Sequence, residues 1–348
     1  MQIINEFQMP AEWDRHEATW LAWPHEITDW PGKFEAIQWV YGEIIRHLSR
    51  VEKVRILIQD AELEQHTLTS LLTQCGAQMA NVEFFHQLTD RSWTRDFCPI
   101  FVRGKHGEAT MLNWQFNGWA KYDNWQLDDA VTASLSSQLG IPMHTPMRDG
   151  RRLVLEGGSI DVNGAGSILT TEECLLSDVQ ARNPGLSRAD MESVFRDYLG
   201  ARHTLWLRNG IAGDDTHGHV DDLARFTDAH TVVIAAESDP SEANYEPLKE
   251  NLALLREMRD QDGAPLRVET LPMPEPVFFD GQRLPASYAN FYIANSLVLV
   301  PTFNDANDRI ALTTLAALFP NRKVVGIAAT DLVLGLGTLH CMTQQQPA

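Results

Sequence analysis

Hydrophobic and polar residues follow the same order of patterns several times along the chain. The segment 156–170 alternates between apolar and polar residues around an Asn-Gly pair, which predicts a β-hairpin. A helix is predicted at 187–199, where Ser187 and Asp190 have the spacing of a capping box. The apolar run 203–207 then predicts one further strand. Two strands, a helix and a strand therefore form one unit.

This order of elements recurs in three other parts of the chain. Each part has a pair of strands, then a helix, then a single apolar strand. In chain order, the three sets are predicted at 99–114, 128–139 and 141–144, at 223–236, 241–259 and 266–271, and at 288–301, 308–318 and 324–327.

A fifth helix and strand lie near the start of the chain. The helix at 33–50 places its apolar residues on one face, and the strand 54–58 follows it. An additional helix at 61–74 and a strand at 82–86 precede the next unit. The first hairpin lacks one strand, so we expect 16–23 to pair with the chain end around 339–343, which closes a ring.

The pattern thus contains about five units of roughly 60–70 residues each. Each unit has an apolar helix face that it cannot cover alone, and packing the units around an axis buries these faces together. We therefore expect one α/β domain over residues 1–348. The alternative is an open α/β sheet divided between two domains, but no Pro- or Ser-rich linker marks a boundary.

Composition excludes several classes of protein. Apolar residues make up 44% and charged residues 22% of 348 residues, which is typical of a globular protein rather than a disordered one. No apolar run is long enough for a membrane helix, and the first residues lack a secretory pattern, so we expect a cytoplasmic protein. A net charge of −19 argues against nucleic-acid binding and mildly favours cationic ligands, although acidity also serves solubility.

The four cysteines form no C-x-x-C pair, which argues against zinc fingers, redox motifs and disulfides. Cys75 and Cys174 lie in apolar patterns and are interpreted as buried structural residues, whereas Cys98 lies beside Asp96. Cys341 lies in a Gly-rich turn, where glycines allow close approach to a ligand. Cys341 is therefore the candidate nucleophile.

Four loops follow the last strand of one unit and open the next hairpin, at 92–99, 155–161, 213–222 and 335–346. If the units are related by rotation, these loops meet near the axis. That geometry would bring together Asp96, Glu156, His219, Asp221 and Cys341. One thiol, one imidazole and three carboxylates suit a planar guanidinium, which presents paired N–H donors to carboxylates. Trp93 could stack on this group.

The segment 214–222 also permits three different interpretations. His217 and His219 would project the same way on a strand and could bind zinc with Asp221. His219 could instead be a general acid and base, with Asp221 serving the imidazole or a ligand. The segment could also be a solvated acidic turn.

The motifs resemble those of the agmatine deiminases, or agmatine iminohydrolases, which belong with the bacterial-type peptidylarginine deiminases. The matching stretches appear in family order over essentially the whole chain: MPAEWDRHEATWLAWPH, WTRDFCP, LEGGSIDVNG, GHVDDLARF and GLGTLHCMTQQQP. The resemblance implies the pentein fold, an α/β propeller of five ββαβ units around a pseudo-fivefold axis. Leu336, Thr338, His217 and the pair Phe97-Cys98 depart from the family pattern, and Cys98 could compete as a reactive thiol.

The resemblance also implies the chemistry. Cys341 would be the nucleophile and His219 the acid and base, while Asp96, Glu156 and Asp221 would hold the guanidinium beside Trp93. Agmatine would be hydrolysed to N-carbamoylputrescine and ammonia through a covalent thiouronium, for polyamine and putrescine synthesis, with no metal or cofactor. A homo-oligomer is a family-level expectation.

Three alternatives to the agmatine reaction remain open. A deiminase of peptidylarginine or of another guanidino compound would use the same mechanism. A metal-dependent amidohydrolase would use His217 and His219. A protein that binds guanidino compounds without catalysis would need only the acidic residues.

Overall fold

The computed structural model describes residues 7–63, 67–104 and 106–348, and five of its sheets repeat one topology. In the unit predicted first, β9 (Ile160–Val162) and β10 (Ser167–Thr171) form an antiparallel hairpin. The chain then crosses through α8 (Arg188–Val194) to β11 (His203–Leu207), which is parallel to β10. The Ser187 and Asp190 side chains form the predicted capping box at the start of α8.

Three further units have the same antiparallel pair, helix and parallel strand. In chain order, their elements are β4 (Ile100–Arg103), β5 (Ala109–Leu112), α6 (Val131–Leu139) and β6 (Met143–His144); β12 (Ala224–Phe226), β13 (Thr231–Ala236), α9 (Tyr245–Glu257) and β14 (Arg267–Pro272); and β17 (Tyr292–Ala294), β18 (Leu297–Thr302), α10 (Asp308–Leu318) and β19 (Lys323–Ala328).

The fifth unit joins the two ends of the chain. Strand β1 (His16–Ala22) pairs with β20 (Gln344–Pro347) in antiparallel orientation and, after α1 (Phe34–Leu48), with the parallel strand β2 (Lys53–Ile58). The prediction of five ββαβ units is therefore confirmed. The predicted pairing of 16–23 with the chain end is likewise confirmed, but its bounds are shifted. Residues 339–343 form a turn in which Thr343 N donates to His340 O, and the strand begins only at Gln344.

Smaller elements complete the chain. The additional strand predicted at 82–86 is β3 (Val82–His86), and it pairs with β2 in parallel orientation. The helix predicted at 61–74 is represented by α2 (Ala61–Leu63) and α3 (Thr69–Cys75), with 64–66 outside the described residues. Short elements that were not predicted are α4 (Thr94–Phe97), α5 (Gln126–Asp129), α7 (Glu172–Leu176), β7 (Met147–Arg148), β8 (Arg151–Arg152), β15 (Phe278–Phe279) and β16 (Gln282–Arg283).

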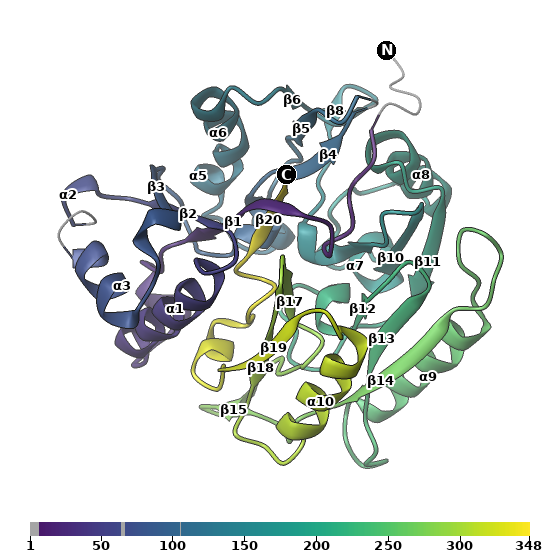
Figure 1. Ribbon diagram of the computed structural model, residues 1–348. Helices are drawn as coiled ribbons and strands as arrows, with labels where there is room; N and C mark the ends of the chain where they lie inside the picture. The colour runs from purple at the N-terminus through teal and green to yellow at the C-terminus, as the bar shows by residue number, and fades with distance from the viewer. Residues whose placement is uncertain (1–6, 64–66, 105) are drawn as a thin grey trace.

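The units are arranged as a fan (Figure 1). Helices α1, α6, α8, α9 and α10 lie toward the outside, whereas strands β1, β20, β17 and β12 lie nearer the centre. One apolar cluster contains Ile44 of α1, Leu135 of α6 and Val298 of β18, so the core joins different units. This packing is the reason that the loops at the inner ends of the strands meet.

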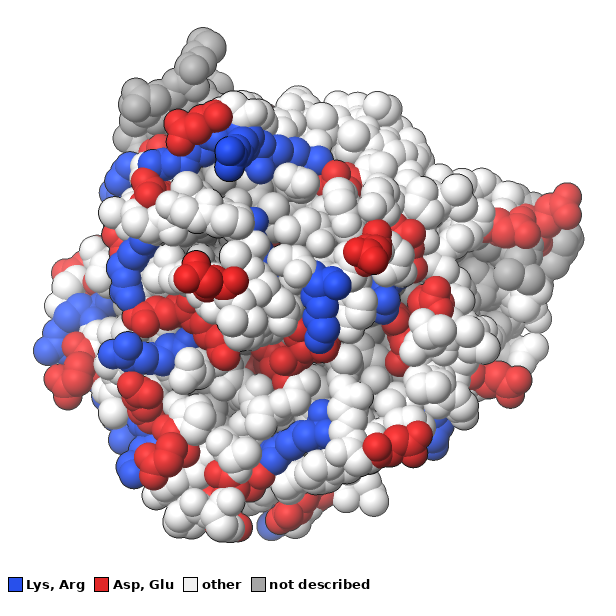
Figure 2. All heavy atoms as spheres, turned by 180° about the vertical axis from the view of Figure 1, so that it is seen from behind, with Lys and Arg blue, Asp and Glu red and all other residues white. Residues whose placement is uncertain are grey.

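Surface charges are mixed in sign. Figure 2 shows Lys and Arg side chains interspersed with Asp and Glu side chains over one face of the molecule. Among the described residues, none of the helices has both the length and the apolar character needed to cross a bilayer.

Candidate active site

The four predicted loops meet at one end of the fan. The backbone of Gly158 shows how closely they approach: a Cβ atom there would lie 2.5 Å from His219 Nδ1, 2.9 Å from Asp96 Oδ1 and 3.1 Å from Asp221 Oδ2. Only glycine leaves room for these three side chains. The Cys341 sulfur lies 3.6 Å from Asp221 Oδ2, so the last loop joins the same cluster.

The cluster borders a cavity of about 420 Å³. Cys341, Asp96, Trp93 and Trp119 are buried residues of its lining. Its lining also includes charged and polar residues, which are Thr28, Asp29, Arg91, Tyr122, Asp215, Thr216, Asp280 and Gln282. A cavity of this size with convergent polar groups is typical of a small-molecule site.

The glycines near the C-terminus let the loop that carries Cys341 pass close to aromatic rings. A Cβ at Gly335 would lie 2.7 Å from both Trp30 Nε1 and Trp93 Cζ2. A Cβ at Gly337 would lie 2.9 Å from Trp93 Cζ3 and 3.2 Å from the Cys341 sulfur. The residue between them, Leu336, has φ = 69° and lines the cavity. Leu336, which departs from the family pattern, therefore forms part of the pocket wall.

The Cys341 thiol is 7% exposed and faces the cavity. Burial, followed by the charges of Asp221, Asp222 and Asp96, raises its pKa well above the usual range. The isolated thiol is therefore protonated at neutral pH. A cation beside the carboxylates would oppose this effect and favour the thiolate.

His219 lies among acidic groups from three loops. Its Nδ1 is 3.9 Å from Asp96 Oδ1 and its Nε2 is 3.7 Å from Glu156 Oε2. Burial lowers the pKa of His219, but Asp96, Cys174 and Glu156 outweigh burial and raise it well above its ordinary value. The ring is therefore an imidazolium at neutral pH and can donate a proton.

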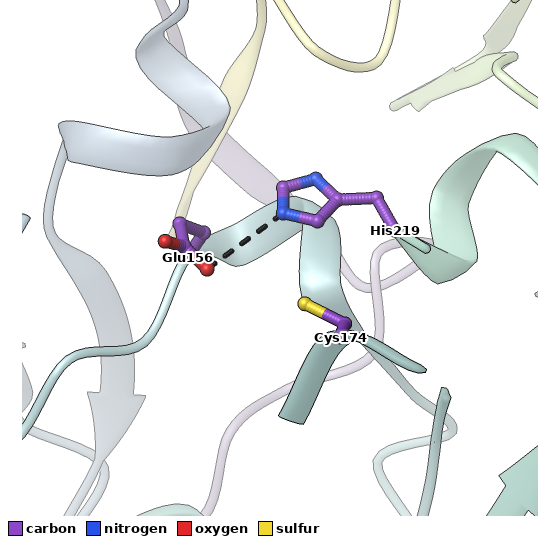
Figure 3. A group of neighbouring side chains, drawn as sticks. All are labelled: Glu156, Cys174 and His219. Atoms are coloured by element: carbon purple, nitrogen blue, oxygen red, sulfur yellow. Dashed lines mark ion pairs between the residues drawn. The ribbon is translucent and has the colours of Figure 1, made fainter. Parts of the chain in front are cut away.

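Glu156 receives a cationic partner that the sequence did not predict. Arg182 Nε donates to Glu156 Oε1 at 3.0 Å, and both side chains are fully buried. Although burial raises the pKa of Glu156, Arg182 and His219 lower it to about 2. Glu156 is therefore ionised, and Figure 3 shows its carboxylate turned toward the His219 ring, with Cys174 nearby.

Asp96 has both oxygens in hydrogen bonds. Gly158 N donates to Oδ1 at 2.9 Å, and Trp119 Nε1 donates to Oδ2 at 2.8 Å. Burial raises the pKa of Asp96 to about 6 although His219 opposes it, and Asp221 and Glu156 add to the rise. Arg95, its neighbour in sequence, pairs with Glu12 instead of Asp96.

Asp221 is held by a histidine that precedes the nucleophile. His340 Nδ1 lies 2.7 Å from Asp221 Oδ2, and His340 Nε2 lies 2.7 Å from Glu12 Oε2. Burial raises the pKa of Asp221, but the hydrogen bond and charge of His340 outweigh it and the pKa is lowered. Asp222 has no such partner, and burial together with Asp221 raises its pKa well above the usual range.

Three carboxylate oxygens of this cluster lack a hydrogen-bond donor among the described residues. They are Glu156 Oε2, Asp221 Oδ1 and Asp222 Oδ1, and His219 Nε2 is likewise unpartnered. Buried polar atoms are normally satisfied, so these oxygens indicate a place where a ligand donates hydrogen bonds. The arrangement suits a cation with several N–H groups in one plane.

Trp93 forms part of the cavity wall. Its ring lies 5.5 Å from Trp30 between centroids, and its Nε1 donates to Asp29 Oδ2 at 3.2 Å. These contacts hold the indole beside Cys341, where it can cover the flat face of a bound cation.

The zinc interpretation of 214–222 is wrong in its geometry. His217 and His219 do not lie on a strand, since His217 has φ = 65° and its Nε2 contacts Ser177 Oγ at 3.2 Å. His219 instead begins a short 3-10 turn. Among the described residues, the sets within metal-binding distance of each other are Glu156, Cys174 and His219; Asp221, Asp222 and Cys341; and His230, Asp260 and Asp262.

The three remaining thiols have different surroundings. Cys174 is buried within an apolar cluster as predicted, and its position on α7 also places it beside His219. Cys98 is buried in the main apolar cluster, where burial raises its pKa well above the usual range, so the hypothesis of a competing reactive thiol is not supported. Cys75 is half-buried and lies against Gly42 of α1.

Sequence reasoning missed several residues of the site. Trp119, Arg182 and Asn290 each contact a predicted residue but lie in segments without a distinctive motif. His340 could have been found from the sequence, because it directly precedes Cys341. Glu12 lies in the first family stretch, but its role depends on a contact across the whole chain.

Known proteins match this chain over nearly its whole length. The model of the Porphyromonas-type peptidyl-arginine deiminase family matches residues 8–347. The agmatine deiminase of Pseudomonas aeruginosa is 34% identical, with 98% of this chain and 96% of that protein covered. The structure of the Enterococcus faecalis agmatine deiminase superposes with a TM-score of 0.88 at 31% identity, covering 99% of this chain and 96% of the other. A Cys-to-Ser variant of the C. jejuni agmatine deiminase, determined with substrate bound, has a TM-score of 0.86 at 30% identity, with coverages of 98% and 96%.

Proposed function

The chain belongs to the Porphyromonas-type peptidyl-arginine deiminase family, and from this premise we propose that it is an agmatine deiminase. It hydrolyses a C–N bond of a linear amidine, converting agmatine and water to N-carbamoylputrescine and ammonia. One observation carries the proposal: the Cys341 sulfur lies 3.6 Å from Asp221 Oδ2, beside a buried cluster in which Asp221 Oδ1 and Glu156 Oε2 have no hydrogen-bond donor within the described chain. A guanidinium supplies those donors and presents its carbon to the sulfur.

Binding is the first step. Glu156 Oε2 and Asp221 Oδ1 accept N–H groups of the guanidinium, and Asp96 adds negative charge from the adjacent loop. The group is fixed in one plane beside Trp93, which reduces the entropy cost of the reaction. The bound charge also lowers the pKa of the Cys341 thiol, and the displaced proton leaves as the cationic substrate enters.

Two covalent steps follow. The Cys341 thiolate attacks the guanidinium carbon and gives a tetrahedral adduct. His219 protonates the departing nitrogen, ammonia leaves, and a thiouronium remains on the sulfur. His219, now neutral, accepts a proton from water as the water attacks. Collapse of the second adduct breaks the C–S bond, and its hydroxyl proton passes to the departing sulfur, which releases the ureido product and the Cys341 thiol. The protonated state of His219 at rest supports its role as the acid of the first half.

The charges around the cavity support agmatine over free arginine. Arg91 pairs with Asp29, and Lys121 near the cavity pairs with Asp215. No unpaired cation therefore lines the described part of the cavity to receive the carboxylate of arginine. Asp280 adds another acidic group to the lining, which favours the distal ammonium of agmatine.

The family match favours a second candidate function, that of a peptidylarginine deiminase. The two are distinguished by comparing ammonia release from agmatine, free arginine and an arginine blocked at both ends. We expect agmatine to have the highest kcat/KM, by at least about tenfold, because both of its ends are cationic. Equal or faster turnover of the blocked arginine would contradict the substrate assignment while retaining the thiol chemistry.

The same ammonia assay also distinguishes a metal-dependent amidohydrolase and a non-catalytic binding protein. A chelator is expected to leave turnover unchanged, whereas a metal-dependent amidohydrolase would lose activity. A protein that only binds guanidino compounds would release no ammonia. Under the proposal the enzyme acts in the cytoplasm in putrescine and polyamine synthesis, and its assembly as a homo-oligomer stays a prediction.

A further inference from the structure

Asn290 contacts the nucleophile from outside the predicted loops. It lies just before β17, is 1% exposed, and has no part in the binding and covalent steps of the proposed reaction. Its Nδ2 lies 3.1 Å from the Cys341 sulfur, which is short for an N–H donor to sulfur. Among the described residues, this is the side-chain amide that directly faces the reacting atom.

The hydrogen-bond network fixes the orientation of this amide. Asn290 Oδ1 accepts from Thr338 Oγ1 at 2.7 Å, from His340 N at 3.0 Å and from Cys341 N at 3.4 Å. Two of these three partners are backbone N–H groups, which can only donate, so the acceptor oxygen must face them. The NH₂ group is therefore left to point at the sulfur.

We propose that Asn290 is a catalytic residue that donates a hydrogen bond to the Cys341 sulfur and stabilises it as the thiolate. The role rests on the proposed function, because it assigns a donor to the nucleophile of that reaction. The amide also ties the sulfur to the backbone of its own loop, since the same side chain holds His340 N and Cys341 N.

The charges around the sulfur explain why a neutral donor is needed there. Asp221 and Asp222 approach the sulfur from one loop and Asp96 from another, and His219 stands among these acids. Each of these carboxylates opposes a negative sulfur when it is ionised. A lysine or arginine at position 290 would pair with them and occupy the place of the guanidinium. An amide favours the thiolate and leaves the carboxylates free for substrate.

The test measures the reactivity of the Cys341 sulfur without using agmatine. Chloroacetamide alkylates a thiolate to a thioether with loss of chloride, and the modified C-terminal peptide is quantified by mass spectrometry between pH 6 and 10. We expect Asn290→Asp and Asn290→Ala each to slow alkylation of Cys341 at pH 8 at least tenfold and to move its pH profile to higher pH. Asp keeps the acceptor oxygen but adds charge, whereas Ala adds none, so slowing in both variants identifies the lost donor.

The control is Thr338→Val, which removes one hydrogen bond to Asn290 Oδ1 but retains the amide donor. We expect it to change alkylation less than threefold. Thermal melts identify variants that fail to fold, and the folded variants are compared. Wild-type alkylation rates in folded Asn290→Ala would overturn the role of Asn290. Wild-type enzyme that does not hydrolyse agmatine would overturn the proposed function instead, because alkylation reports the donor independently.

In the agmatine assay, the two Asn290 variants are expected to lower kcat more than they raise KM. A change confined to KM would contradict the proposal, because it would place Asn290 in substrate binding rather than at the nucleophile.

Discussion

The inner and outer parts of the site, which are the carboxylate cluster beside Cys341 and the wall of the cavity, contain similar acidic residues whose oxygens are differently satisfied. In the inner part, Glu156 pairs with Arg182 and Asp221 with His340, yet Glu156 Oε2 and Asp221 Oδ1 have no hydrogen-bond donor among the described residues. In the outer part, Asp29 pairs with Arg91. Asp215 pairs with Lys121 and also accepts from Tyr122 Oη at 2.6 Å.

This difference shows where binding energy is concentrated. A carboxylate that already has a cationic partner attracts a second cation only weakly, because that partner neutralises much of its charge. An unpaired carboxylate oxygen in a buried site gains much more from a cationic donor, since its desolvation has already been imposed by the fold. Substitutions in the inner part should therefore affect turnover, and those in the outer part should mainly affect substrate affinity.

The largest effect is expected at the nucleophile. Cys341→Ala should lower kcat for agmatine by at least about 1,000-fold, because no other side chain replaces the covalent step. The measurement is ammonia release under saturating substrate. Cys75→Ala, which changes a half-buried thiol on α3, is the matched control and should retain wild-type turnover within about twofold. Normal turnover by Cys341→Ala would exclude the thiol mechanism.

The adjacent acids Asp221 and Asp222 allow a comparison of two carboxylates with opposite pKa shifts within the inner part. Asp221→Asn should lower kcat/KM at least about 100-fold, because it removes an ionised group that faces the substrate. Asp222→Asn should lower it less than about tenfold, since burial and the neighbouring Asp221 disfavour the charged form of Asp222 and Asn is likewise neutral. Steady-state kinetics of both variants provide the measurement. Equal losses would show that the two carboxylates are not electrostatically distinct.

The pH profile compares one acid from each part. Burial raises the pKa of Asp96 to about 6 and that of Asp29 to about 6, so both lose their negative charge as the pH falls below that value. We expect kcat/KM to be full above pH 6 and to fall below it, because protonated Asp96 no longer attracts the guanidinium. The Asp29→Asn variant should show the same fall in kcat/KM at acid pH. If this fall disappears in Asp29→Asn, its cause is the protonation of Asp29 in the outer part.

The smallest effects are expected in the outer part. Asp215→Asn should raise KM for agmatine about threefold to tenfold with kcat unchanged, because the distal ammonium loses a partly screened attraction. Higher salt should reduce the difference between this variant and wild type. A large fall in kcat would contradict the division of the cavity into two parts.

The fold was largely predictable because its units are encoded locally. Alternation and helical periodicity located β3, β11 and α10 at their observed bounds. The capping box at Ser187 was likewise local, since both of its partners lie within one turn. Periodicity did not predict α4, which carries Asp96, because four residues are too few to show a helical period.

The chain by itself determined which chemical groups were available and which loops carried them, because loop order follows from the order of strands and helices. Tertiary structure alone decided which carboxylate oxygens stayed without a hydrogen-bond donor and which way the Asn290 amide turned. It also decided that the pKa of Asp221 is lowered while that of Asp222 is raised. These properties depend on burial and on partners such as His340 that lie more than a hundred residues away in sequence. Electrostatic and hydrogen-bond energies act through space, so they are defined only after the units have packed together.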